Sequence, residues 1–301
     1  MTPASRAVAY DLSGWSGFLL PTLLPSCARL AAEPSDSWER IRDRLPPDVG
    51  AFVFHVNLTD SSRCPADRAA LARFLRSRGV RVLNDRVTDI SKRHVQSLCA
   101  THGLPITRAS KSGPPDELLI VKTDRNYGGK PEIELDTAVC AAYEIDAREV
   151  DPAPDHGYRV LPRRETEPSV WADRSLLVER FVANPEDLFY RVYFIGRHIA
   201  ISEGCEHAPV KTIGRAERRR LLLFRGDESE AFGAGAPPDM RRLVDVTVRF
   251  IRAASMDFGC LDVVRDADGE FYVIDMNATP HWGAETERRI LDFLRSGCDE
   301  L

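Results

Sequence analysis

Short apolar runs alternate with helical segments over the first hundred residues. The runs have the length of buried strands and lie at 7–10, 51–56 and 80–83. Helical spacing of apolar positions follows over 65–79, where Pro65 opens a helix and Gly79 closes it as a left-handed cap. A second helix is expected over 88–103, with Thr88 as its N-cap. This alternation predicts helices packed on a parallel sheet.

Two features of this leading segment bear on function. The segment 13–17, Ser-Gly-Trp-Ser-Gly, follows the first strand at the edge where open parallel sheets bind ligands, and is either an ordinary turn or a substrate loop. His55 lies in an apolar strand, a position more typical of a core histidine than of a ligand or a base.

Further strands are predicted beyond residue 117 from apolar runs at 118–121, 176–182 and 188–195. The region 147–171 is rich in Pro, Asp, Arg and Glu, and we interpret it as a connection with surface loops. The arginine cluster at 215–220 is followed by an apolar run and is interpreted as a solvated helix face.

Two basic side chains on these strands are candidates for binding an anion. Lys122 leaves its strand just before a loop that contains Gly128 and Gly129. This arrangement resembles a phosphate cradle of backbone N–H groups and one ammonium, and the alternative is a hairpin turn. Arg191 shares a strand face with aromatic residues such as Phe189, where it either meets an anion or packs its stem on a solvated face.

The strongest motif is a hairpin near the end of the chain. Predicted strands at 259–264 and 271–277 flank Asp268-Gly269, the best two-residue hairpin signal in the sequence. A two-residue loop places Asp262 directly opposite Asp275, and period two puts Asn277 on the same face as Asp275. A loop of three to five residues would shift this register.

Two carboxylates facing each other across a ladder repel unless a cation lies between them. All-oxygen ligands suit Mg²⁺ or Mn²⁺, which also take oxygens from substrate phosphates. The hairpin therefore predicts a metal site, and the alternative is an exposed face with solvated aspartates.

Composition narrows the class of protein. The 301 residues suggest about two domains, and 43% hydrophobic with 29% charged residues is ordinary globular usage. A net charge of −5 leaves no basic excess for nucleic acid, and no apolar run approaches the about 20 residues of a membrane span. Seven singly scattered cysteines and no secretion-type N-terminus predict a reducing compartment, the cytoplasm.

Taken together, these residues resemble the ATP-grasp superfamily of carboxylate–amine ligases. The resemblance is closest to the branch with glutathione synthetase, D-alanyl-D-alanine ligase and the ribosomal-protein glutamate ligases, and is clearest over 80–285. It implies an α/β (α+β) chain with a Rossmann-like leading domain over 1–88. Two α+β subdomains that clamp ATP would follow, the small one with its connecting region over 89–175 and the large one with the metal site over 176–301.

The resemblance also assigns roles to residues of this chain. Asp262, Asp275 and Asn277 match the metal ligands, although the family often has Glu where Asp275 stands. The nucleotide would be bound by residues from several segments, namely Lys92, Lys122, Gly128, Gly129, Glu179, Val182 and Glu186. Lys92 and Lys122 would contact its phosphates. The backbone of Val182 would pair with adenine, and Glu179 and Glu186 are candidates for polar contacts to adenine and ribose.

Arg191 matches the arginine that stabilises the transferred phosphoryl group. Lys211, His207 and His281 are candidates for a general base near it, and Lys211 is counted with Arg191 as catalytic. The implied reaction uses ATP with Mg²⁺ or Mn²⁺ to form an acyl phosphate on a carboxylate, which an amine then attacks to form an amide.

The expected partners are small-molecule or peptide carboxylate and amine substrates, with no nucleic acid and no membrane. A homodimer is the commonest assembly of soluble proteins. Two alternatives to the ligase remain open at this stage: a catalytically silent ATP-binding regulatory protein, and a phosphotransferase that forms no amide.

Overall fold

The computed structural model describes residues 6–12, 17–34, 36–65, 67–145, 158–207, 217–228, 232, 236–282, 287–298 and 300. The strands are β1 (Arg6–Asp11), β2 (Ala28–Ala31), β3 (Val49–His55), β4 (Arg81–Leu83), β5 (Leu118–Thr123), β6 (Arg159–Pro162), β7 (Leu176–Arg180), β8 (Leu188–Ile195), β9 (His198–Cys205), β10 (Glu217–Arg225), β11 (Phe258–Arg265) and β12 (Phe271–Asn277). The helices are α1 (Leu19–Leu23), α2 (Trp38–Asp43), α3 (Arg68–Ser77), α4 (Lys92–Thr101), α5 (Lys130–Ile133), α6 (Thr137–Ala142), α7 (Pro168–Ala172), α9 (Pro238–Ala254) and α10 (Arg288–Cys298), with 3₁₀ turns at Asn126–Gly129 and Arg163–Glu165.

The leading sheet is parallel and has the strand order β2-β1-β3-β4, which confirms the predicted β/α alternation. Helix α3 buries Leu71, Ala72 and Leu75, which lie on one face. Strand β2 was not predicted, because a four-residue strand that alternates buried and exposed positions has no apolar run. The predicted cap of α4 was wrong: Ser91, not Thr88, accepts the capping hydrogen bond from the His94 amide.

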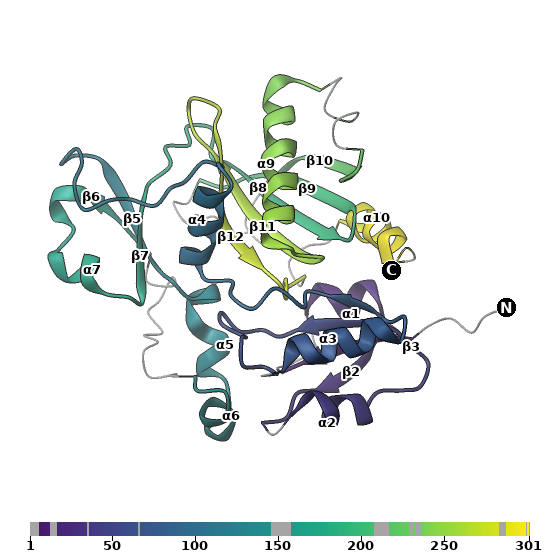
Figure 1. Ribbon diagram of the computed structural model, residues 1–301. Coiled ribbons are helices and arrows are strands. Elements are labelled where there is room, and N and C mark those ends of the chain that lie inside the picture. Colours follow the sequence, from purple (N-terminus) through teal and green to yellow (C-terminus); the bar gives the residue numbers. More distant parts are fainter. Residues whose placement is uncertain are drawn as a thin grey trace.

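A small antiparallel sheet of three strands, β6-β5-β7, lies at the left of Figure 1. Strand β6 and all but the last residue of helix α7 fall inside the region 147–171 that was interpreted as surface connection, so that interpretation was wrong for these two elements. Strand β7 follows the expected boundary at residue 175, yet it pairs with β5 in this small sheet.

The large sheet is antiparallel, with the order β10-β9-β8-β11-β12. Alternate residues of its central strands face two separate cores. Val192 and Leu261 face the core that α9 and α4 complete, whereas Tyr193 and Cys260 face the core that α1 and α10 complete. The sheet is therefore covered by helices on both faces (Figure 1).

The arginine cluster lies on a strand and not on a helix. Strand β10 pairs with β9 from Glu217 to Arg225, so the helix predicted there was wrong. The expectation of solvent exposure was right, since 217–220 are exposed. The consecutive arginines carry no periodicity, and pairing with β9 decided the conformation.

The hairpin β11–β12 confirms the predicted pairing but not the predicted loop. Asp262 lies opposite Asp275, and Cys260 lies opposite Asn277. The strands part after Arg265 and Phe271, so the loop is longer than Asp268-Gly269 alone. A bulge between Asp262 and Val263 compensates for the longer loop. Asp262 pairs with Asp275 and Val263 pairs with Val273, so Ile274 is an additional residue on β12.

One asparagine joins the leading sheet to the large sheet. Asn84, after β4, is buried and has a left-handed φ of 58°. Its side-chain oxygen accepts hydrogen bonds from the amides of Asp257 and Phe258, at 2.9 and 3.1 Å. Its side-chain nitrogen donates to the Phe258 carbonyl at 2.8 Å, and its backbone N–H donates to the Asp257 carboxylate at 2.8 Å. These bonds fix the leading domain against the start of β11.

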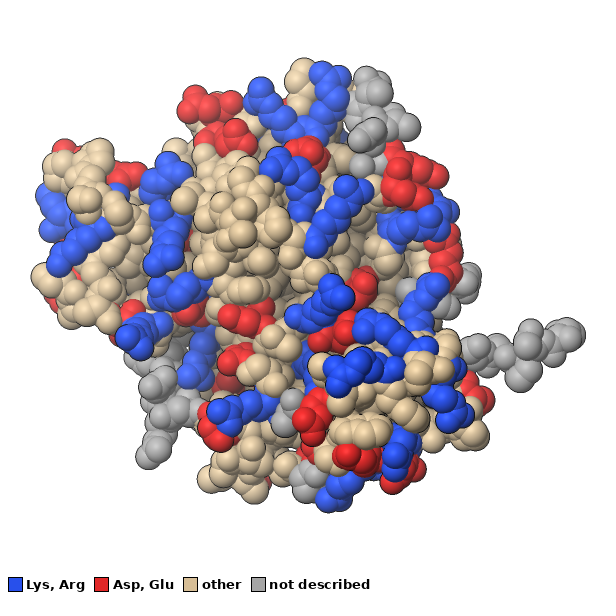
Figure 2. Space-filling model, in the orientation of Figure 1, with Lys and Arg blue, Asp and Glu red and all other residues tan. Residues whose placement is uncertain are grey.

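Basic and acidic side chains are intermixed on the face shown in Figure 2, in keeping with the small net charge. Within the described part of the chain, none of the helices combines the length and the apolar character needed to cross a bilayer.

Candidate active site

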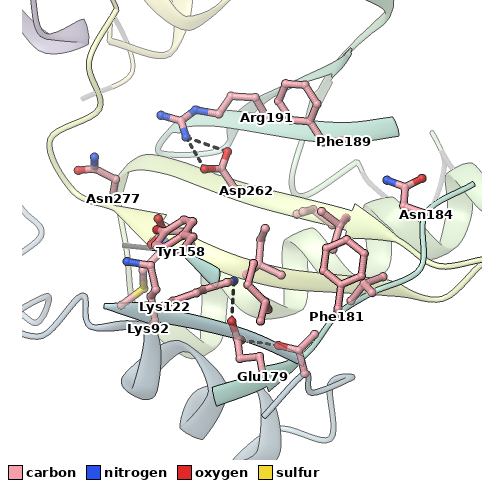
Figure 3. A pocket seen from close by; sticks show the side chains of 18 of the residues that line it. Lys92, Lys122, Tyr158, Glu179, Phe181, Asn184, Phe189, Arg191, Asp262 and Asn277 are labelled. Carbon is pink, nitrogen blue, oxygen red and sulfur yellow. Dashed lines mark hydrogen bonds and ion pairs between the residues drawn. The ribbon is translucent and has the colours of Figure 1, made fainter. Parts of the chain in front are cut away.

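A cavity of about 560 Å³ lies between the small sheet and strands β8, β11 and β12 of the large sheet. Figure 3 shows two regions in it. Lys92, Arg191, Asp262 and Asn277 lie toward one side, and Phe181 lies toward the other. Phe189 also lines the cavity, with Val182 and Ile274 packed in the same apolar cluster. The bulge of β12 lets the neighbouring residues Ile274 and Asp275 both line the cavity. This division suits a ligand with one apolar, planar part and one highly charged part.

Three charged residues of the large sheet lie side by side on neighbouring strands. Asp262 of β11 is the register partner of Arg191 on β8 and of Asp275 on β12. One terminal nitrogen of Arg191 donates to both Asp262 oxygens, at 2.6 and 2.7 Å (Figure 3). Asn277 lies two residues beyond Asp275, and its side-chain oxygen accepts a hydrogen bond from the Thr279 amide at 2.8 Å. The structure thus brings the predicted metal ligands and Arg191 together.

The pKa values of this group reflect burial and mutual charge. Burial raises the pKa of Asp275, and nearby Asp262 raises it further, whereas Lys92 and Lys122 act in the opposite direction. Burial alone would lower the pKa of Arg191, but the Asp262 carboxylate raises it well above the ordinary value. A buried carboxylate beside a second one favours the arrival of a cation.

Lys92 approaches the same region from the beginning of α4. It is buried, and its ammonium donates to the Arg125 carbonyl at 2.7 Å. Burial would lower its pKa, but the charges of Asp275, Tyr158 and Glu179 raise it, with a net increase. The Tyr158 ring lies 5.9 Å from the ammonium and also lines the cavity. Tyr158 was not predicted as a site residue, because it stands alone after a polar segment with no periodic signal.

Lys122 and Glu179 project from the small sheet toward the cavity (Figure 3). The Lys122 ammonium lies 2.5 Å from one Glu179 oxygen, and the other oxygen accepts a hydrogen bond from the Thr107 hydroxyl. Glu179 is fully buried. The structure therefore places Glu179 against a lysine, a contact that the sequence analysis did not expect.

The glycine loop is neither a strand nor a hairpin. Asn126–Gly129 forms a tight turn in which Tyr127, Gly128 and Gly129 have φ values of 50°, 67° and 78°. Asn126 and Tyr127 line the cavity, whereas Gly128 and Gly129, which were predicted to bind the nucleotide, are buried and are not among the lining residues. The Asn126 amide donates to the Thr59 hydroxyl at 2.9 Å, which ties the loop to the leading domain.

The connection between β7 and β8 contributes different residues from those expected. Val182 lines the cavity as predicted, but Glu186 is not among its lining residues and lies 3.6 Å from Arg265. Asn184 and Asp187 line it instead. Asp187 has a left-handed φ of 53°. No sequence pattern predicts this backbone conformation, so the orientation of the side chains in this turn could not be predicted.

The candidate bases are only partly placed. His207 and His281 both line the cavity. His207 lies 2.7 Å from the Asp187 carboxylate, and His281 packs beside Phe18 from the leading domain. Lys211 lies outside the described residues, as do 13–16 of the candidate substrate loop. His55 is fully buried 3.1 Å from Asp11, as expected of a core histidine.

No family model and no curated protein matches this sequence. Solved structures do match over nearly the whole chain. The D-cycloserine synthetase DcsG is 16% identical, with a TM-score of 0.50 over 98% of this chain and 99% of that one. The ATP-grasp ligase PsnB, complexed with minimal precursor, Mg and ADP, is 12% identical, with a TM-score of 0.50 over 97% of both chains.

A third structure is the RiPP-associated ATP-grasp ligase of Chryseobacterium gregarium, in complex with ADP and a leader and core peptide. It is 11% identical, with a TM-score of 0.52 over 99% of this chain and 97% of that one. These matches agree with the sheet topology and with a cavity between two antiparallel sheets. The chain therefore has the ATP-grasp fold.

Proposed function

We propose that this protein is an ATP- and Mg²⁺-dependent ligase that joins a carboxylate to an amine through an acyl phosphate. One observation carries the proposal. Arg191, Asp262 and Asp275 stand in register on three neighbouring strands, and Lys92 and Lys122 approach the same end of the cavity from other elements. Two adjacent carboxylates surrounded by basic side chains suit divalent cations together with polyphosphate oxygens.

The donor set fits Mg²⁺. Asp262, Asp275 and Asn277 can each present a side-chain oxygen, the kind of ligand that Mg²⁺ prefers. Bound there, Mg²⁺ would neutralise phosphate charge and orient the phosphates. Arg191 already binds the Asp262 carboxylate, so a metal would share that ligand with the arginine.

Different side chains would then contact different parts of ATP. The apolar end, with Phe181, Val182 and Phe189, would hold adenine away from water. Lys92 and Lys122 would bind phosphate oxygens, and Arg191 would offset the charge that develops during transfer. The γ-phosphoryl group moves from ATP to an oxygen of the substrate carboxylate, and ADP leaves.

An amine then attacks the acyl carbon. Phosphate leaves with the carboxylate oxygen that received the phosphoryl group, the amine loses a proton, and an amide forms. The solved structures support this proposal through what they are named: a D-cycloserine synthetase and peptide-bound ATP-grasp ligases, two of them with ADP and one with Mg. The carboxylate here is accordingly proposed to be an amino acid or a peptide side chain, and the protein is proposed to act in the cytoplasm.

The test is release of ADP from ATP in the presence of Mg²⁺ with pools of carboxylates, with and without amines. Hydroxylamine is included in a parallel series, because it traps acyl phosphates as hydroxamates. A ligase gives ADP with a carboxylate and an amine together, and a hydroxamate in the trap. Accumulation of a phosphorylated product that no amine consumes would identify a phosphotransferase, and ATP binding with no turnover in any pool would identify a silent binding protein.

A further inference from the structure

Thr279 connects the proposed metal ligand Asn277 to the leading domain. It lies two residues after Asn277, and its side chain is buried. Its amide donates to the Asn277 side-chain oxygen at 2.8 Å, which closes a local turn. Its hydroxyl lies 3.2 Å from the same oxygen and 2.9 Å from the side-chain oxygen of Asn57, two residues beyond the end of β3. The hydroxyl therefore has one acceptor in each domain.

The single proton of this hydroxyl cannot serve both acceptors at once. A threonine hydroxyl has one O–H donor, and within the described part of the chain the Thr279 side chain makes no hydrogen bond other than these two. Because Thr279 is only 1% exposed, bulk water is not an alternative acceptor. The proton is directed either to Asn57 or to Asn277, and the shorter distance favours Asn57.

The direction of this proton decides how many lone pairs the Asn277 oxygen keeps. An amide oxygen has two, and the backbone N–H of Thr279 already uses one of them. If the hydroxyl donates to Asn277, the second lone pair is occupied as well. If the hydroxyl donates to Asn57, that lone pair stays open for a cation. An acceptor in the leading domain thus leaves Asn277 able to bind a metal.

Backbone contacts between the two domains hold these groups near one another. The Leu19 amide donates to the Pro280 carbonyl at 2.8 Å, and the Trp282 amide donates to the Gly17 carbonyl at 2.6 Å. Both bonds join the segment that follows β12 to the leading domain, which also carries Asn57. The distance from Asn57 to the hydroxyl is therefore set by the way the leading domain packs against the large sheet.

From these contacts we infer that Asn57 and Thr279 are positioning residues for the metal ligand Asn277. Asn57 accepts the hydroxyl proton of Thr279 and so prevents it from occupying the Asn277 oxygen. The inference rests on the proposed function, since it requires that Asn277 binds a divalent cation. It extends the metal site into the leading domain, so the affinity for the metal depends on a side chain from that domain.

The experiment measures the binding of Mn²⁺ in the presence of ADP, from the loss of the electron paramagnetic resonance signal of free Mn²⁺. Asn57→Leu has no acceptor, so the hydroxyl turns to Asn277, and the Mn²⁺ affinity should fall by about 10-fold or more, as is usual when the partner of a metal ligand is removed. Asn57→Asp keeps an acceptor and should retain the affinity. Thr279→Val removes the competing hydroxyl, so its affinity should match that of the unmodified protein.

A second set of variants separates this effect from charge and packing. In a Thr279→Val background no hydroxyl is present, so Asn57→Leu and Asn57→Asp should bind Mn²⁺ equally well. Differences as large as those seen with Thr279 in place would come from charge or packing alone and overturn the inference. Thr247→Val removes another buried hydroxyl, on α9 and outside the cavity lining, and should leave the Mn²⁺ affinity unchanged.

The outcomes separate the inference from the proposed function. Asn57→Leu and Thr279→Val break the same hydrogen bond, so a purely structural role predicts equal loss of Mn²⁺ affinity in both. That result, or unchanged affinity in Asn57→Leu, overturns the inference while the proposed function stands. If the unmodified protein binds no Mn²⁺, or if Asn277→Ala binds it fully, the metal assignment itself is wrong and the inference fails with it.

Circular dichroism checks that each variant is folded. Asn57→Ala, which has no acceptor and a smaller side chain, replaces Asn57→Leu if leucine disturbs the fold, and the same loss of Mn²⁺ affinity is expected.

Discussion

Asp262 occupies the central position of the charged cluster, between an arginine and a second aspartate. Its carboxylate both accepts from Arg191 and stands where a divalent cation would be shared with Asp275. The loss of this one charge should therefore affect metal binding and the orientation of Arg191 together.

Asp262→Asn tests this position. Because the amide cannot neutralise Mg²⁺ or hold the Arg191 guanidinium as a carboxylate does, Mg²⁺-dependent ADP release should fall by about 10²- to 10³-fold. Initial rates are measured across a range of Mg²⁺ concentrations. Asp268→Asn, in the exposed hairpin loop, is the matched control and should keep full turnover. Full turnover in Asp262→Asn would show that the metal assignment is wrong.

The site residues that could be predicted from the sequence are those whose orientation follows from strand periodicity. Arg191, Asp262 and Asp275 were found because alternation along a strand fixes the face of each side chain. Glu179 was placed on the correct strand, but its contact with Lys122 depends on the pairing of β5 with β7, which are more than fifty residues apart. Tyr158 had no local signal at all.

At the scale of elements, contacts between segments decided what local patterns left open. The hairpin shows this most clearly: the predicted opposition of Asp262 and Asp275 is present, but a bulge produces it and not a two-residue loop. A longer loop and a bulge each shift the register, and the two shifts cancel. The conformation of β10 is likewise determined by its pairing with β9 and not by its own composition.

The junction at Asn84 should be a strong determinant of stability. Asn84→Ala removes three side-chain hydrogen bonds between the leading and large sheets, and alanine also tolerates the left-handed φ of 58° less well. The free energy of unfolding should fall by about 3 kcal/mol, at about 1 kcal/mol per bond. Urea denaturation measures it. Asn57→Ala, which removes a single hydrogen bond to Thr279, should cost about a third as much.

His198 on β9 should make stability depend on pH. It is buried, packs on Phe293 of α10, and burial lowers its pKa below 6.5 although Glu300 opposes the shift. The unfolded chain then binds this proton more readily than the folded chain, so stability falls as the pH drops below about 6.5. The slope is at most about 1.4 kcal/mol per pH unit.

Urea denaturation between pH 7.5 and 5.5 tests this dependence. In His198→Gln the slope of stability against pH should be shallower than in the unmodified protein, whatever the absolute stability of the variant. Identical slopes would mean that other groups cause the acid dependence.

At the scale of the whole molecule, the thiols report how the three sheets are packed. Five of the seven cysteines are buried, and Cys140 and Cys298 are partly accessible. Burial raises the pKa of Cys27 and Cys64 to about 11, and that of Cys260 to about 12, so their reactive thiolates are scarce.

Thiol labelling at pH 8 with a disulfide reagent checks this packing. Cys140 and Cys298 should react first, and the other five only after a denaturant is added. Mass spectrometry of the labelled peptides identifies each site. Rapid labelling of Cys260 in the folded protein would contradict the close packing of β11.

The sheets were more predictable from the sequence than the short strands at their edges. Apolar runs and helical spacing gave the parallel leading sheet and most strands of the other two, since burial of apolar surface dominates folding. The short strands β2 and β6 depend on partners far along the chain and carry no such signal.

The Gln96 side chain has a consequence for motion. It joins Thr107, which pairs with the small sheet, to Val273 of the large sheet, and both bonds are made from one helix, α4. Movement of one sheet relative to the other would break or strain these bonds. Gln96 should therefore restrain the width of the cavity between the two sheets.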